Sequence, residues 1–171
     1  MNYELINTNN EYRSFLSDEI DGWQNDGYLY AITGCFGSHH HNHKKLWDSK
    51  VKDITHHLNN FQRTITGSRY WKKALHKQVK AIIFPESASK LHYHGVILIP
   101  NFVYKDANNA LSFELKELKV IDVFYKTHKK DFKNSCYIKR VECLKGWINY
   151  STKNFDNPLN EFDMSDFLIL P

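Results

Sequence analysis

The chain has 171 residues, enough for one domain with a hydrophobic core but too few to add a second enzyme domain of ordinary size. It carries 23 Lys and Arg against 19 Asp and Glu, an excess that permits nucleic-acid binding without requiring it. Three cysteines argue against a disulfide framework, and no apolar run approaches the roughly 20 residues that span a bilayer. Because its first residues also lack the pattern of a secretory signal, we expect a soluble, intracellular protein.

The first third of the chain predicts a helix, a strand and a polar loop. Apolar residues at helical spacing predict a helix over Tyr12–Trp23, and the aromatic and β-branched segment Tyr28–Phe36 predicts a strand that is apolar on both faces. The loop 37–45 contains four histidines. We interpret it as a solvated loop, with metal binding, or phosphate contact through Lys44 and Lys45, as alternatives.

The middle of the chain predicts a helix followed by a β-hairpin. Apolar residues three and four apart over Trp47–Thr64 predict a long amphipathic helix that covers one face of the sheet. Val79–Glu86 and Lys90–Ile99 are rich in β-branched residues and predict two strands. Only a short polar segment separates them, so a hairpin is the natural connection.

Two histidines on the second strand of this hairpin are candidate metal ligands. Side chains two apart leave the same face of a strand, so His92 and His94 can bind one metal ion while Tyr93 points the other way. If the connection covers five residues, Glu86 lies opposite His92 and completes a triad of ligands. A four-residue connection would place Glu86 opposite Leu91, and a simple exposed turn carboxylate is the alternative interpretation.

The last third is expected to alternate helix, strand and loop. Asn108–Leu118 predicts a helix, Lys119–Tyr125 a short strand or an irregular basic segment, and Lys126–Asp131 a charged loop. Ser135–Glu142 predicts the last strand of the sheet. The acidic segment 154–171 is expected to pack across the domain or to lead into a partner.

A helix predicted over Lys145–Lys153 carries the second candidate motif. Residues three apart share one face of a helix, so the Tyr150 hydroxyl and the Lys153 ammonium can reach the same phosphate. We expect this helix and the histidine strand to form one active site.

The order of these motifs resembles that of the HUH endonucleases, specifically the single-tyrosine initiators of rolling-circle replication. Leu29–Thr33 is loosely similar to the first motif of that family, a central strand. His92–His94 matches the second motif, His-hydrophobe-His, with an aromatic residue where an aliphatic one is commoner. Tyr150–Lys153 matches the third motif, Tyr-x-x-Lys. Relaxases place the tyrosine before the histidines, and the related transposases usually have glutamine instead of lysine. The initiator branch therefore fits best.

The resemblance implies an α+β fold with a central antiparallel sheet of about five strands flanked by helices. We expect a single domain over residues 1–171, with a core at about 28–155 and an acidic tail at 156–171 that ends the domain or leads into a further one. Mn²⁺ or Mg²⁺ would be held by Glu86, His92 and His94, and Tyr150 would be the nucleophile, assisted by Lys153.

The implied function is that of a sequence-specific single-stranded DNA endonuclease and strand transferase. It would nick an origin through a covalent 5′-phosphotyrosine intermediate. The expected partners are single-stranded or hairpin origin DNA and a helicase, in the same chain or from the host. The expected location is the cytoplasm of a prokaryotic host, or wherever the replicon resides.

Basic residues beside aromatic ones are candidate DNA contacts, because unpaired bases stack on aromatic side chains while cations hold the phosphates. These candidates are Lys44, Lys45, Arg69, Lys72 and Lys73. For the segment 68–77, a solvated basic face is the alternative interpretation.

Three other functions agree with the same residues. A single-tyrosine transposase or a mobilisation relaxase would act on other DNA ends. A non-catalytic DNA-binding protein would not need Tyr150. A metal hydrolase would use water as its nucleophile, with Tyr150 only packing.

Overall fold

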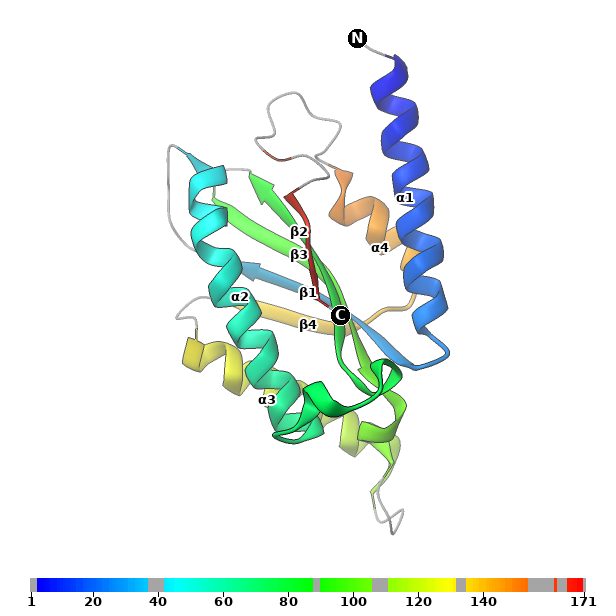
Figure 1. Cartoon of the computed structure of the whole chain (residues 1–171), viewed down its shortest axis with the longest axis vertical. Coiled ribbons are helices and arrows are strands. Elements are labelled where there is room, and N and C mark those ends of the chain that lie inside the picture. Colours follow the sequence, from blue (N-terminus) through cyan, green and yellow to red (C-terminus); the bar gives the residue numbers. More distant parts are fainter. Residues whose placement is uncertain are drawn as a thin grey trace.

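A five-stranded antiparallel sheet carries helices on both of its faces (Figure 1). The computed structural model describes residues 3–36, 42–87, 90–105, 111–131, 135–153, 162 and 166–170. Within these residues the fold is α+β, as the sequence predicted. No helix in this described part of the chain has both the length and the apolar character needed to cross a membrane.

The α-helices and strands are defined by hydrogen bonds along the described segments. The α-helices are α1 (Tyr3–Trp23), α2 (His43–Thr66), α3 (Phe113–Asp131) and α4 (Leu144–Ser151). The strands are β1 (Gly27–Cys35), β2 (Lys80–Ser87), β3 (Leu91–Pro100), β4 (Cys136–Arg140) and β5 (Leu168–Leu170). Short 3-10 turns occur at Tyr70–Lys72, Leu75–Lys77 and Asn101–Tyr104.

Strand β3 is the centre of the sheet, whose order is β4-β1-β3-β2-β5. All of its residues except His92 are buried, because it has a strand on each side and helices on each face. The predicted hairpin is the pair β2–β3. The metal-ligand candidates therefore stand on the middle strand and its neighbour.

The alternation of side chains along the strands divides the core in two. Residues such as Ile32 and Ile97 pack with α2 and α3 on one face, and residues such as Leu29 and Val96 pack with α1 and α4 on the other. Figure 1 shows the two helix pairs on opposite sides of the sheet. Because both faces of the sheet are covered by helices, β1 has apolar side chains on both faces and its sequence does not alternate between apolar and polar residues.

Helix α2 begins earlier than Trp47, the first residue of the predicted helix. The Asn42 side chain accepts a hydrogen bond from the Lys45 backbone N–H at 2.7 Å, which satisfies one of the free donors of the first turn. The helix ends before Gly67, whose φ of 97° suits glycine.

Helix α3 corrects two predictions. Lys119–Tyr125 is not a strand or an irregular segment and Lys126–Asp131 is not a loop, since both continue the helix that begins at Phe113. Val120, Phe124 and His128 follow one another at intervals of four residues and are all buried. One buried helix face therefore continues past the boundary expected after Tyr125. Phe124 packs on Phe61 and His57 of α2.

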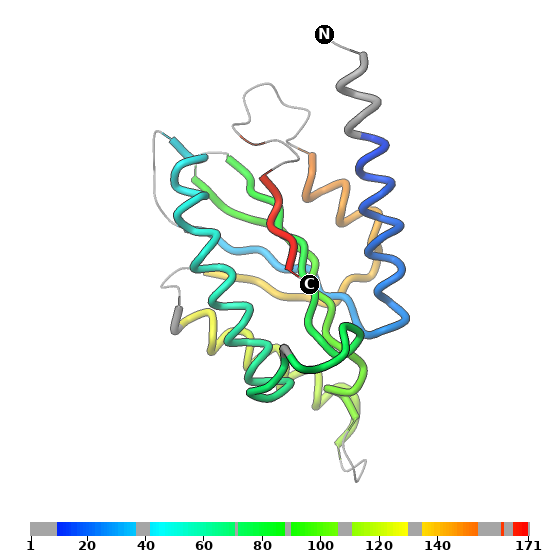
Figure 2. The backbone as a smooth tube through the Cα atoms, in the orientation of Figure 1, coloured from blue at the N-terminus to red at the C-terminus, as the bar shows by residue number. Residues whose placement is uncertain are grey.

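The segment Ser135–Glu142 does not supply the last strand of the sheet. It contains β4, but β5 follows later in the chain and pairs with β2 at the other edge. Figure 2 shows this last strand, in red, next to the green strands. Phe162 is also buried, so the described residues of the C-terminal segment pack on the domain, one of the two outcomes expected from the sequence.

Gly34 makes room for the aromatic residue between the two histidines. Gly34 lies directly opposite Tyr93 in the β1–β3 pair, and a Cβ atom at this position would collide with the tyrosine ring. Tyr93 is buried on the α2 side, where its ring centroid lies 5.6 Å from that of Phe36. Tyr93 thus points away from the ligand face, as predicted.

We expect Gly34→Ala to lower the free energy of unfolding by about 1–3 kcal/mol, because the added methyl group overpacks the Tyr93 ring. Gly22→Ala is the matched control: this glycine lies in α1 with open space around its Cβ position, so the substitution should be neutral or stabilise by up to about 1 kcal/mol. Urea denaturation measures both. Equal effects at the two positions would contradict the packing role of Gly34.

Candidate active site

The register of the β2–β3 hairpin brings the three predicted metal ligands together. Glu86 lies directly opposite His92, so the connection covers five residues, 87–91, and the alternative pairing with Leu91 does not occur. His94 lies two residues farther along the same face of β3. The predicted position of Glu86 opposite His92 is confirmed, and its role as a metal ligand stays a prediction.

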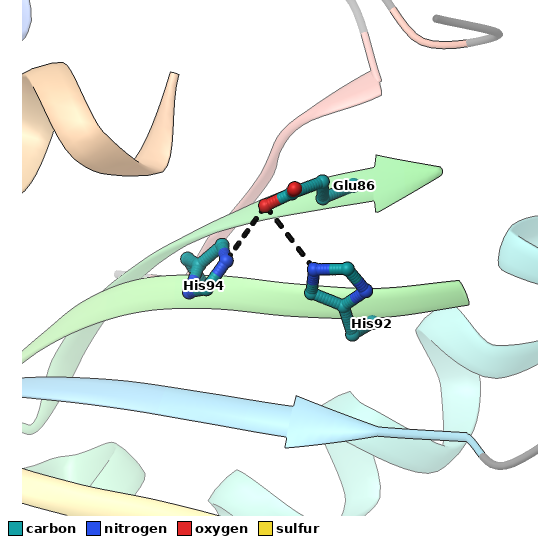
Figure 3. Close-up of side chains that lie close together, drawn as sticks. All are labelled: Glu86, His92 and His94. Atoms are coloured by element: carbon teal, nitrogen blue, oxygen red, sulfur yellow. Dashed lines mark hydrogen bonds and ion pairs between the residues drawn. The ribbon is translucent and has the colours of Figure 1, made fainter. Parts of the chain in front are cut away.

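Both imidazoles converge on one oxygen of the Glu86 carboxylate (Figure 3). Glu86 Oε2 lies 2.7 Å from His94 Nε2 and 3.2 Å from His92 Nε2. One ligand atom from each residue falls within 4.8 Å of the other two. Glu86 and His94 are buried, whereas the His92 side chain is 23% exposed, so the group opens to solvent on the His92 side.

A backbone carbonyl sets the tautomer of His92. Its Nδ1 lies 2.9 Å from the carbonyl oxygen of Lys90, and a carbonyl can only accept a hydrogen bond. Nδ1 therefore carries a proton, and in the neutral ring the lone pair is on Nε2, which faces Glu86. This is the tautomer that a metal ligand at Nε2 requires.

The hydroxyl of Thr33 contacts the corresponding nitrogen of His94 and, unlike a carbonyl, can either accept or donate the hydrogen bond. Thr33 on β1 lies opposite His94 on β3, and its Oγ1 is 3.0 Å from His94 Nδ1. With Nδ1–H donating to Thr33, the lone pair of His94 Nε2 would be available to a cation in place of the present 2.7 Å contact with Glu86 Oε2. The sequence placed Thr33 on the central strand without giving it this role, because strand pairing cannot be read from one segment alone.

The contacts within this group shift the pKa values of Glu86 and His92. Burial alone raises the pKa of the Glu86 carboxyl, but the hydrogen bonds with His92 and His94 outweigh it and hold that pKa below its ordinary value. The hydrogen bond to Glu86 raises the pKa of His92, against the opposing effect of burial. An ionised carboxylate without a cation thus favours the protonated imidazole, and a divalent cation would replace that proton.

Helix α4 sets Tyr150 beside this group. The ring centroids of Tyr150 and His94 are 5.0 Å apart. Lys153 Nζ lies 4.1 Å from the centroid of the Tyr150 ring and 3.9 Å from Glu86 Oε1. The structure therefore brings all five predicted catalytic and metal-binding residues together. Tyr150 remains 46% exposed, so a substrate can reach its hydroxyl.

The tyrosine helix is shorter than predicted. It ends at Ser151, and Lys153 follows in the next turn. The Thr152 hydroxyl donates to the Ile148 carbonyl at 2.8 Å, and the Thr152 backbone N–H donates to the same carbonyl at 3.0 Å. Lys153 still lies over the Tyr150 ring, so the two residues are close together although Lys153 is not on the helix.

Two contacts that the sequence did not reveal hold α4 in place. The Trp147 indole N–H donates to the Gly95 carbonyl at 3.0 Å, and Arg13 of α1 donates to both Oγ1 and the carbonyl of Thr152 at 2.8 Å. Trp147 precedes Tyr150 by three residues, so helical spacing could have indicated its position. Arg13 is 139 residues from Thr152, and no local pattern indicates that pair.

The predicted DNA contacts fall in two separate places. Lys44 and Lys45 lie in the first turn of α2, at the same end of the sheet as the β2–β3 hairpin but on the helix pair of the opposite face (Figure 1). Lys44 Nζ is 3.3 Å from Asp166 Oδ2, so its charge is partly balanced. The histidine loop at 37–41 lies outside the described residues.

Arg69, Lys72 and Lys73 belong to the connection after α2, at the other end of the sheet. Lys73 Nζ lies 4.8 Å from the ring centroid of Phe102, which is two residues beyond the end of β3. Roughly 20 Å of strand separates that end of β3 from His94, at about 3.3 Å per residue. The structure does not bring this basic segment to the ligand group, and its role in DNA binding stays a prediction.

Comparison with known proteins adds one distant similarity. No known protein family matches the chain, and no solved structure matches it. A segment of 89 residues, 52% of the chain, is 25% identical to part of Nonribosomal peptide synthetase 32 of Fusarium pseudograminearum. The match spans about 1% of that protein. At this identity and coverage it establishes no family.

We expect Thr33→Val to weaken Mn²⁺ binding by about 10- to 100-fold, because His94 loses the hydroxyl that orients its ring. Thr33→Ser keeps the hydroxyl and should bind within a few fold of the unmodified protein. Isothermal titration calorimetry measures the affinity. Equal Mn²⁺ affinities for the Val and Ser variants would contradict the role of the Thr33 hydroxyl in orienting His94.

Proposed function

We propose that this protein is a metal-dependent nuclease that nicks and rejoins single-stranded DNA through a covalent bond to Tyr150. The observation that carries the proposal is the meeting of an exposed tyrosine, a lysine and a His-His-Glu group at one point of the sheet. The distances are 5.0 Å between the rings of Tyr150 and His94 and 3.9 Å between Lys153 and Glu86.

The ligand chemistry fits a hard divalent cation. Two imidazole nitrogens and one carboxylate oxygen suit Mn²⁺ well and Mg²⁺ acceptably, and three protein ligands leave coordination positions for a substrate. Glu86, His92 and His94 would hold the ion. When bound, it would supply Lewis-acid polarisation of the oxygens of a phosphate group.

Tyr150 supplies the nucleophile. A bond forms between its phenolic oxygen and phosphorus, the bond from phosphorus to the 3′ oxygen breaks, and the proton lost by the phenol is balanced by the one gained at the 3′ oxygen. The products are a 5′-phosphotyrosyl strand and a free 3′-hydroxyl. Because a phenol is a good leaving group, the 3′-hydroxyl of a strand can later attack the ester and reseal the DNA.

Lys153 supports this step electrostatically. An unassisted phenol has a pKa of about 10, so the attacking form needs stabilisation near neutral pH. The ammonium over the Tyr150 ring would stabilise the negative charge that develops around phosphorus as the phenolic oxygen attacks. Lys153 is 44% exposed, so its charge is partly screened and its effect is that of a helper.

The motif order supports a role in starting rolling-circle replication. Histidines before tyrosine and a lysine after it are similar to the initiator branch of the HUH endonucleases. In this role the free 3′-hydroxyl would prime synthesis, and the partners would be origin DNA, single-stranded or extruded as a hairpin, and a helicase.

We expect Tyr150→Phe to abolish covalent adduct formation while DNA affinity stays within a few fold, because only the attacking oxygen is lost. Labelled single-stranded oligonucleotides of random and hairpin sequence are incubated with Mn²⁺ and resolved on a denaturing gel. Tyr125→Phe, which alters an exposed tyrosine of α3, is the control that should retain the adduct.

An adduct that survives in Tyr150→Phe would contradict the proposal. Cleavage without any adduct would favour a metal hydrolase that uses water. DNA binding without cleavage would favour a non-catalytic binding protein.

A further inference from the structure

A surface pocket of about 350 Å³ lies next to the candidate active site. It is formed between strand β4 and the first turn of α4. Residues of β4, of the connection 141–143 and of α4 line it, among them Tyr137, Lys139, Val141, Cys143, Gly146 and Trp147. Its volume falls within the range of about 300–1,000 Å³ that is usual for small-molecule sites.

The pocket opens on the same face of the sheet as the metal ligands. Thr33 of β1 pairs with His94 on one side and with Tyr137 on the other, so these three side chains form one row across three strands. Neighbouring strands are about 4.8 Å apart, which puts Tyr137 roughly 10 Å from His94.

Trp147 belongs to both the pocket and the active site. Its ring is stacked on Tyr150 at a centroid distance of 5.4 Å and an interplanar angle of 28°, and its centroid lies 5.8 Å from that of His94. The indole N–H bond to Gly95 fixes the ring in this position. A group bound in the pocket against Trp147 is therefore a close neighbour of a group attacked by Tyr150.

The lining has the chemistry of a stacking site. Tyr137 is 51% exposed although it is a large aromatic residue, and Trp147 offers a second aromatic surface. Gly146 adds no side chain that would fill the space between them. Lys139 and Arg140 add positive charge to the lining, where Lys139 Nζ lies 3.0 Å from the carboxylate of Glu142. Exposed aromatic rings beside cations are typical of sites for unpaired bases.

We propose that this Tyr137–Trp147 pocket holds an unpaired base of the DNA strand, from a nucleotide that flanks the phosphodiester cleaved by Tyr150. The inference rests on the proposed function and adds to it a site for the substrate beside the reacting phosphate. Trp147 positions that base and Tyr150 together, so the pocket fixes the strand relative to the nucleophile.

Photochemical crosslinking tests the pocket without a known target sequence. Random-sequence single-stranded DNA containing 5-iododeoxyuridine is bound to the Tyr150→Phe protein, which leaves the strand intact, and is irradiated; crosslinked peptides are then mapped by mass spectrometry. We expect crosslinks at Tyr137 or Trp147. Crosslinks confined to other residues would overturn the proposal.

Affinity measurements with the same DNA give a second test. Loss of one stacking ring in Tyr137→Ala should weaken binding between about fivefold and a hundredfold. Tyr137→Phe keeps the ring and should restore binding. Phe15→Ala removes another exposed aromatic ring, on the outer part of α1, and should change nothing. Equal DNA affinity of Tyr137→Ala and the unmodified protein would overturn the proposal that the pocket binds a base.

The combined outcomes distinguish failure of the pocket proposal from failure of the proposed nuclease function. A Tyr150 adduct with crosslinks elsewhere would overturn the pocket and leave the proposed function standing. Crosslinks at Tyr137 or Trp147 without any adduct would support a base-binding pocket and contradict the nuclease. No binding of single-stranded DNA at all would overturn both.

Discussion

The hydrogen-bond register of the β2–β3 hairpin is the constraint on which the candidate site depends. It puts Glu86 opposite His92, and the pleat of β3 then brings His94 to the same carboxylate oxygen. A shift of one residue would turn the Glu86 side chain to the other face, into the apolar layer under α2 and α3. The five-residue connection and the buried apolar positions of both strands therefore fix the ligand group together with the core.

The second requirement is that α4 keeps its place on the sheet. The helix has only two turns, so its own hydrogen bonds cannot fix its position. Ile148 is buried in the core under α1, the Trp147 indole is bound to the carbonyl of Gly95, and Arg13 holds the end of the helix through Thr152. Through these contacts the N-terminal helix, far away in sequence, helps to position Tyr150.

Much of this arrangement could be predicted from local patterns, and the rest depends on pairing between distant segments. The spacing of His92 and His94 predicted that they share one face of a strand, and the spacing of Tyr150 and Lys153 predicted that they share one face of a helix. The hairpin predicted that Glu86 lies opposite His92. The partnership of Thr33 with His94, and of Arg13 with Thr152, required the order of strands and the packing of α1. The sequence did not predict α3 as one continuous helix, because the many charged residues on its outer face obscured the four-residue spacing of the buried Val120 and Phe124.

The central claim is that Glu86, His92 and His94 hold a divalent cation beside Tyr150. Anomalous diffraction from crystals grown with Mn²⁺ tests it most directly, because it locates the ion without assuming any substrate. We predict a peak in contact with all three side chains and facing the Tyr150 ring. A peak bound elsewhere, or no peak at this group when Mn²⁺ is saturating, would contradict it.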